Sequence, residues 1–144
     1  MLHEKNIRTL NDLIDAAARL RSRELPFTVH VMFGLPGDGK AEFLETTRLA
    51  LAEGASGVKF HDLLLIPGTA LHQDWAAGHL SPVDPEAYLD AVATALVEIP
   101  QKTVVWRVCS DPEDRKGRPQ PGEKWPKNHF LNRLRHEVLK RRVL

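Results

Sequence analysis

Residues 28–40 have the sequence TVHVMFGLPGDGK, which joins a short apolar run, a glycine-rich loop and the start of a helix. An apolar run rich in β-branched residues is typical of a buried parallel strand. The glycines and the proline that follow predict a tight turn into a helix, whose first backbone N–H groups have no intrahelical acceptors. The stretch therefore predicts a strand, a turn and a helix N-terminus that offers donors to an anionic or nucleotide-like ligand.

Two interpretations of this loop are open. The loop nearly matches the phosphate-binding loop of nucleotide-binding proteins, because Gly34 is followed after four residues by Gly39-Lys40. In that loop a Ser or Thr follows the lysine and ligates magnesium. Ala41 stands at that position here, so the metal ligand is missing. The sequence favours a plain strand-to-helix turn, and a small stand-alone nucleotide- or phosphate-binding protein that uses residues 34–40 is the alternative.

Length and composition indicate one domain over residues 1–144, with 42% hydrophobic residues and a formal net charge of +1. No stretch reaches the roughly eighteen uninterrupted apolar residues of a membrane helix, and the N-terminal MLHEKNIR has no apolar signal segment. We therefore expect a cytoplasmic protein that does not enter a membrane. The single cysteine, Cys109, excludes an internal disulfide and is too few for a structural zinc or iron–sulfur site, so we expect no metal in this chain.

Helical and strand-like patterns alternate along the chain. Helices are predicted over residues 9–23, 41–53, 71–78 and 84–98 and from Asn128 onward, and strands over residues 28–33, 58–66 and 103–109. This alternation predicts an α/β unit with a parallel sheet. Because a parallel barrel needs about eight strands, three strands form either a small open sheet or part of a larger barrel.

Capping signals support three of these helix boundaries. Thr9, with Asp12 three residues later, predicts a capping box, and Asp84 before a proline predicts another helix start. Gly54 stands where a helix C-terminal cap belongs. Residues 111–126, rich in charge, proline and glycine, predict a long loop.

Four polar residues, His30, Lys59, His61 and Arg107, lie inside strand-like runs. For each one alone, a strand residue that reaches solvent is the ordinary interpretation, but four together favour a pocket. Side chains alternate along a strand, so Lys59 and His61 share one face whereas Asp62 faces the other. We therefore do not expect His61 and Asp62 to form an acid–base pair.

The last predicted helix is basic. Its cations are most simply a solvated face, and no aromatic residues are interleaved with them for base stacking, so we do not expect nucleic acid binding. These cations are Arg133, Arg135, Lys140, Arg141 and Arg142.

The order of these motifs resembles the C-terminal half of a radical S-adenosylmethionine (radical SAM) protein, and specifically the YhcC-like Fe–S oxidoreductases. The segments that carry the resemblance are HVMFGLPGD (30–38), GVKFHDLLLIPGTAL (57–71), SPVDPEAYLDAVATALVEIP (81–100), VVWRVCSD (104–111) and KWPKNHFLNRLRHEVLKRR (124–142). Together they cover essentially the whole chain.

The resemblance implies a partial, half TIM-type barrel. In this family a three-cysteine motif holds a [4Fe–4S] cluster whose open iron binds the amino acid end of S-adenosylmethionine (SAM), and that motif is missing here. The resemblance places His30, Lys59, His61 and Arg107 in the barrel interior, where substrate or cofactor lies. It places Val31, Phe33 and Gly34 beside the SAM adenine, and Ile66, Pro67 and Gly68 in the adjacent wall of the cofactor site.

A chain of this kind would be a gene fragment, a split protein or a remnant, and we expect it not to be catalytic alone. Its partner would be an N-terminal radical SAM half, or a second copy joined through exposed sheet edges.

Overall fold

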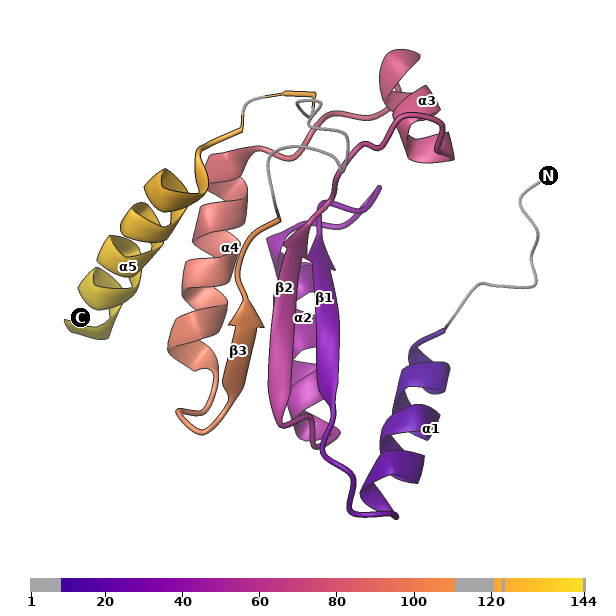
Figure 1. Cartoon of the computed structure of the whole chain (residues 1–144), viewed down its shortest axis with the longest axis vertical. Helices are drawn as coiled ribbons and strands as arrows, with labels where there is room; N and C mark the ends of the chain where they lie inside the picture. The colour runs from indigo at the N-terminus through magenta and orange to yellow at the C-terminus, as the bar shows by residue number, and fades with distance from the viewer. Residues whose placement is uncertain (1–8, 111–120, 123, 144) are drawn as a thin grey trace.

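A computed structural model describes residues 9–110, 121–122 and 124–143 of the chain. Strands and helices alternate along it, as the sequence predicts (Figure 1). In chain order the elements are α1 (Leu10–Arg21), β1 (Thr28–Phe33), α2 (Lys40–Ala52), β2 (Gly57–Asp62), α3 (Ala70–Ala76), α4 (Pro85–Glu98), β3 (Val104–Arg107) and α5 (Lys127–Val143).

The strands form one parallel sheet in the order β1-β2-β3. Thr28 to Phe33 of β1 pair without interruption with Gly57 to Asp62 of β2. The pairing of β2 with β3 is interrupted by a bulge, because Val58 is opposite Val105 but Lys59 is opposite Arg107. The expected α/β class is confirmed, and within the described residues the sheet is open, with β1 and β3 as its edges.

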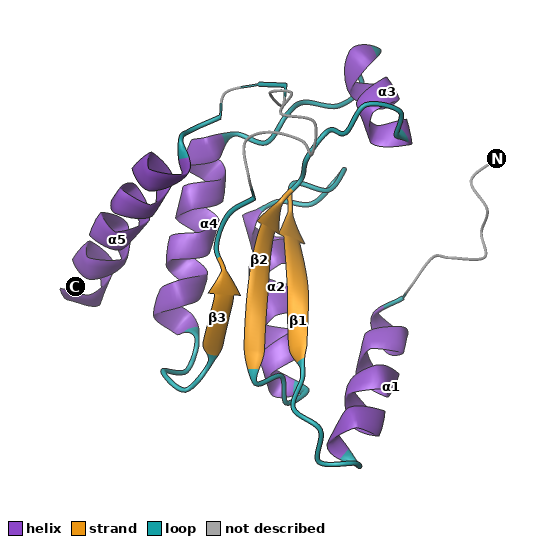
Figure 2. Cartoon of the chain, viewed as in Figure 1, coloured by secondary structure: helices purple, strands orange, loops and turns teal. Residues whose placement is uncertain are grey.

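Helices cover one face of this sheet. In the view of Figure 2, α2 lies behind β1 and β2, and α4 lies between the sheet and α5. Val58 and Phe60 of β2 are fully buried on this face, and Val31 of β1 is 2% exposed. They pack in one core with Phe43 of α2 and Val92 of α4. Apolar side chains on alternate strand positions thus attach the sheet to its helices.

The opposite side of the sheet is here called the open face. Among the described residues it has no helix packed on it, and its side chains are more exposed than those of the core: Met32 is 42% exposed and Trp106 is 67% exposed. The open face carries Thr28, His30, Met32, Lys59, His61, Val104, Trp106 and Arg107.

The predicted caps are confirmed. The Thr9 hydroxyl accepts a hydrogen bond from the backbone N–H of Asp12, and the Asp12 carboxylate accepts one from the Thr9 backbone. Asp84 caps α4 through two backbone N–H groups of the first turn. Gly54 follows α2 at φ +92°, the left-handed conformation that glycine adopts without strain.

Three predicted boundaries are wrong. β2 ends at Asp62 rather than at residue 66, because β1 ends at Phe33 and leaves the later residues without a ladder partner. β3 covers only residues 104–107 of the predicted 103–109. α5 begins at Lys127, one residue before the predicted start at Asn128. The predicted loop over residues 111–126 falls largely outside the described residues.

The turn after β1 depends on Gly34. Its φ is +92°, and a Cβ at this position would lie 2.4 Å from Cγ2 of Val83. Gly37 has a similar φ of +83°, but a Cβ there would have no neighbour within 4 Å. Substitutions at the two glycines therefore distinguish the effect of backbone strain alone from the effect of strain combined with steric overlap.

We predict that Gly34→Ala lowers the free energy of unfolding by about 2–4 kcal/mol, because it adds overlap to an unfavourable φ. Gly37→Ala, the matched control, should cost only about 1 kcal/mol. Chemical denaturation of the three proteins measures both values. Equal losses in the two variants would show that Val83 moves away freely and that the turn is looser than the structure indicates.

Candidate functional site

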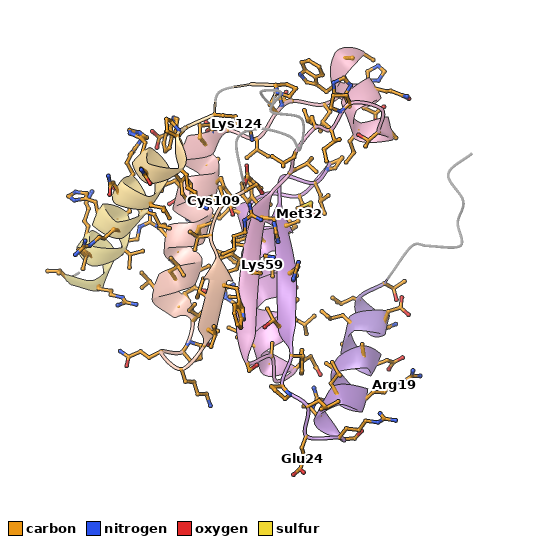
Figure 3. The ribbon with its side chains drawn as sticks, in the orientation of Figure 1. Arg19, Glu24, Met32, Lys59, Cys109 and Lys124 are labelled. Atoms are coloured by element: carbon orange, nitrogen blue, oxygen red, sulfur yellow. The ribbon has the colours of Figure 1, made fainter. Side chains whose placement is uncertain are left out.

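Three basic side chains form a row across the middle of the open face. The strand register places His30 opposite Lys59, and Lys59 opposite Arg107. Neighbouring strands lie about 4.8 Å apart, so the three positions span about 10 Å. Figure 3 shows Lys59 at the centre of the sheet, with Met32 farther toward the carboxyl end of β1. We call His30, Lys59 and Arg107 the cation row.

His61 extends the cation row by one position along β2. Its ring stacks on that of His30, with centroids 5.2 Å apart and an interplanar angle of 29°. The Nε2 atom of His61 is buried and has no hydrogen-bond partner among the described residues. Burial lowers the pKa of His61, and the positive charges of Arg107, His30 and Lys59 lower that pKa further. The four polar residues that the sequence singled out are therefore close together.

The bulge in β3 fixes the direction of Arg107. Its Nε donates a 2.6 Å hydrogen bond to the backbone carbonyl of Cys109, two residues along the chain. A bulge places two successive side chains on the same side of a strand, and both Trp106 and Arg107 lie on the open face. The guanidinium is thereby attached to the backbone at the end of β3 and held beside Lys59.

Trp106 covers the amino-terminal end of the open face. Its indole Nε1 donates a 3.0 Å hydrogen bond to the Thr28 hydroxyl, which requires the ring to pass over Gly57. A Cβ at Gly57 would lie 2.9 Å from that same Nε1. Glycine in the middle strand thus permits a large aromatic side chain to bridge the two edge strands.

The six residues that the resemblance places beside the cofactor fall into two groups. Val31 and Phe33 are 2% and 7% exposed, with side chains in the helix-covered core, so a ligand on the open face would meet their backbone. Gly34 follows the carboxyl end of β1. Ile66, Pro67 and Gly68 lie in the exposed turn before α3, and Ile66 is 46% exposed.

The residues of the phosphate-loop alternative are already engaged. Lys40 Nζ lies 2.7 Å from the Asp90 carboxylate on α4. At the N-terminus of α2, the Glu42 carboxylate accepts a 2.8 Å hydrogen bond from the backbone N–H of Gly39, and this bond lowers the pKa of Glu42. A protein carboxylate thus lies where a bound phosphate would have to be, which argues against this alternative.

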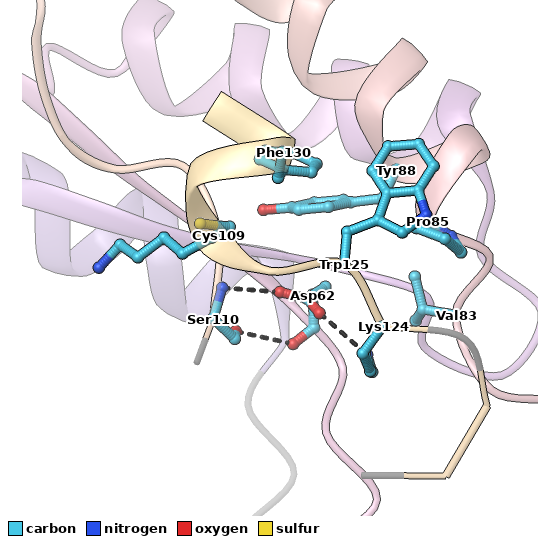
Figure 4. Close-up of a pocket in the computed structure, with 10 residues that line it drawn as sticks. Asp62, Val83, Pro85, Tyr88, Cys109, Ser110, Lys124, Trp125 and Phe130 are labelled. Atoms are coloured by element: carbon cyan, nitrogen blue, oxygen red, sulfur yellow. Dashed lines mark hydrogen bonds and ion pairs between the residues drawn. The ribbon is translucent and has the colours of Figure 1, made fainter. Parts of the chain in front are cut away.

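A second polar group was not predicted. Asp62, at the end of β2, accepts a 2.8 Å hydrogen bond from the Ser110 backbone and pairs with Lys124 at 3.1 Å (Figure 4). The side chains of Asp62 and Lys124 are only 12% and 16% exposed. Sequence reasoning placed Asp62 on the helix-covered face but gave no signal for a partner 62 positions away.

The pocket beside Asp62 is small. It encloses about 30 Å³ and is bordered by Tyr88, Trp125 and Phe130, a volume that suits one or two water molecules. The Tyr88 hydroxyl is already bonded to the carbonyl of Val108 at 2.7 Å. The group therefore fastens the strand ends to the segment before α5 and is too small for a substrate.

Comparison with known proteins identifies the family. The model of the radical SAM C-terminal domain matches residues 55–140, which is more than half of the chain. Protein YhcC of Escherichia coli (strain K12) is 29% identical over 114 residues, covering 75% of this chain and 37% of that protein. Uncharacterized protein MJ0486 of Methanocaldococcus jannaschii is 27% identical over 154 residues, covering 98% and 45%.

A solved structure shares the fold. The archaeal Elp3 of Methanocaldococcus infernus, with an N-terminal deletion, superposes with a TM-score of 0.78 at 20% identity, covering 95% of this chain and 32% of that chain. This chain belongs to the radical SAM C-terminal domain family, and the expected resemblance and partial-barrel fold class are confirmed. The chain spans less than half the length of these curated relatives. No helix in the described part of the chain is long and apolar enough to cross a membrane.

The lowered pKa of His61 predicts a pH-dependent stability. Because burial and its cationic neighbours hold the folded pKa below 6.5, the unfolded chain takes up more protons at His61 between the folded pKa and about pH 6.5. Stability from this group is complete above pH 6.5 and is lost as the pH falls through that window. His61→Asn should therefore lose less stability than the wild type between about pH 7 and pH 5.

The measurement is chemical denaturation at several pH values. His136→Asn, on the exposed side of α5, is the matched control and should keep the wild-type pH slope. An unchanged slope in His61→Asn would show that His61 takes up its proton as readily in the folded protein as in the unfolded one.

Proposed function

We propose that this chain supplies part of the SAM and substrate walls of a radical SAM enzyme, and that another polypeptide segment holds the [4Fe–4S] cluster. The observation that carries the proposal is the open face, a side of the parallel sheet that no described helix covers. It gathers His30, Lys59 and Arg107 around His61, whose buried Nε2 has no hydrogen-bond partner among the described residues. Parallel sheets ordinarily have both faces covered. An uncovered face with converging polar groups is what one wall of a barrel interior looks like.

The turns at the carboxyl ends of the strands suit a ligand such as SAM, whereas the cysteine content does not suit the cluster. The Gly34 turn and the exposed turn at Ile66, Pro67 and Gly68 follow the carboxyl ends of neighbouring strands, where parallel α/β proteins bind ligands. The chain has one cysteine, Cys109, which is 6% exposed at the end of β3. One thiolate cannot hold a [4Fe–4S] cluster, which needs three or four.

In the assembled enzyme the reduced cluster would supply the electron that cleaves SAM. The part of this chain would be to position the cofactor and the substrate. Backbone groups at Val31, Phe33 and Gly34, with the turn at residues 66–68, would line the adenine. His30, Lys59, His61 and Arg107 would face the reacting groups from the barrel interior.

A partner that completes the barrel would pair with an edge strand and cover the open face. Met32, Val104 and Trp106 are 42%, 48% and 67% exposed there. Such exposed apolar side chains are typical of a surface that binds another protein segment. We propose an N-terminal radical SAM half with its own cysteines as this partner, with self-association through the same edges as the other possibility.

Anaerobic reconstitution with iron and sulfide tests this assignment. The isolated chain should give no stable cluster absorbance and no reductive cleavage of SAM, because it offers one thiolate. Adding an N-terminal radical SAM half that carries a three-cysteine motif should restore both. A monomeric chain that assembled a stoichiometric [4Fe–4S] cluster alone would overturn the proposal.

The phosphate-loop alternative makes a different prediction for Lys40. Because its ammonium pairs with Asp90, we expect Lys40→Ala to leave nucleotide binding unchanged and to cost at most about 1 kcal/mol of stability, as is usual for an exposed ion pair. Titration with magnesium–ATP measures the first quantity and denaturation the second. A tenfold loss of nucleotide affinity, about 1.4 kcal/mol, would favour the alternative instead.

A further inference from the structure

The cation row is an unusual arrangement for a sheet. Three basic residues stand directly opposite one another on three adjacent strands, and His61 stacks on His30 one position farther along. Like charges in opposite positions destabilise a sheet. Strand pairing and core packing do not require cations at these positions, because the open face takes no part in the core.

Among the described residues, no carboxylate pairs with Lys59, the central residue of the cation row. Asp62 acts to raise the pKa of His61, but burial and the three basic neighbours outweigh it. Asp62 lies on the other face, where it pairs with Lys124 and Ser110. The ammonium of Lys59 forms no hydrogen bond or ion pair with another described residue. By contrast Lys40, Arg48 and Arg133 on the helices each have a carboxylate partner.

From this juxtaposition we infer that His30, Lys59, His61 and Arg107 form a binding site for an oxyanion, a carboxylate or phosphate group carried by the substrate. The inference rests on the proposed function, which does not name a substrate, and it specifies the chemical class of that substrate. An ammonium and a guanidinium side by side are the strongest donors for such a group. The buried His61 Nε2 adds a polar atom that needs a partner.

Depth within the sheet separates the cation row from the turns at Gly34 and Gly68. His30 lies four residues before Gly34, and Lys59 lies three residues before the end of β2. At about 3.3 Å per residue, the cation row is about 10–13 Å below the rim where the Gly34 and Gly68 turns lie. The oxyanion therefore belongs to a ligand that reaches into the barrel, rather than to a group held at the rim.

The test is a titration of the full chain with inorganic phosphate at constant ionic strength, followed by NMR of the histidine imidazoles. Phosphate should bind saturably with a dissociation constant on the order of millimolar. It should raise the pKa of His61 by about half a unit or more, because an anion beside the imidazole favours the protonated ring. Chloride at equal ionic strength should not.

Three variants identify the residue responsible. Lys59→Gln should weaken phosphate binding at least about tenfold, and Lys59→Arg should retain it. Lys102→Gln, which removes a cation from the exposed turn before β3, is the matched control and should bind as the wild type. Thermal midpoints establish that each variant is folded. Equal binding by Lys59→Gln and Lys102→Gln, or no saturable binding by the wild type, would overturn the inference.

Two further ligands show whether the bound oxyanion belongs to the substrate or to SAM. They also distinguish a failure of this inference from a failure of the proposed function. SAM carries a carboxylate and 5′-methylthioadenosine does not. If the oxyanion belongs to the substrate, SAM will not displace phosphate from the cation row. Displacement by SAM but not by methylthioadenosine would assign the site to the cofactor and overturn the substrate assignment. Phosphate binding without any SAM binding in the reassembled enzyme would refute the proposed function while leaving the anion site in place.

Discussion

The structure depends on the burial of one face of the central strand. Val58 and Phe60 of β2 are fully buried against α2 and α4, and of the described strands only β2 has a ladder partner on both sides. Burying two such side chains contributes about 3–6 kcal/mol, a large share of the stability of a domain this size. Because side chains alternate, the same strand must present Lys59 and His61 on its other face. The packing that holds the fold together thus fixes where the ionisable groups point.

The one-sided packing explains why the strands differ in length and order. β1 and β2 have six paired positions, and the apolar side chains on their core face pack against the helices. β3 has four residues, is joined to β2 through a bulge, and carries Trp106 and Arg107 on the open face. A second layer against that face would bury Trp106 and Val104. The described residues therefore form a core on one face of the sheet, and the proposed partner would cover the other face.

Much of this arrangement could be predicted from the sequence, because local signals determine it. Apolar alternation gave the face of each β2 residue, the Thr9 and Asp84 caps gave two helix starts, and the glycine at position 34 marked the turn after β1. These features depend on residues near in sequence.

The features that could not be predicted depend on residues far apart. The end of β2 is set by where β1 stops, and the bulge that brings Arg107 beside Lys59 is set by pairing between two strands. The Asp62–Lys124 pair joins the end of β2 to the segment before α5. No periodicity within one segment carries this information. The sequence therefore identified the four polar residues but not their alignment across the three strands.

The proposed oxyanion site illustrates how basic side chains can be oriented without a second layer on their own side of the sheet. Arg107 is oriented by its hydrogen bond to the Cys109 carbonyl, and His61 by its stack on His30. Two of the four residues of the proposed site are thus oriented by contacts within the chain. Orienting charged groups before a ligand arrives lowers the entropy cost of binding it. Repulsion between Lys59 and Arg107 opposes folding and is offset by the core on the opposite face, and an anion bound at the proposed site would reduce it. The apolar core on one face of the sheet therefore stabilises the fold enough to tolerate the basic residues on the other face.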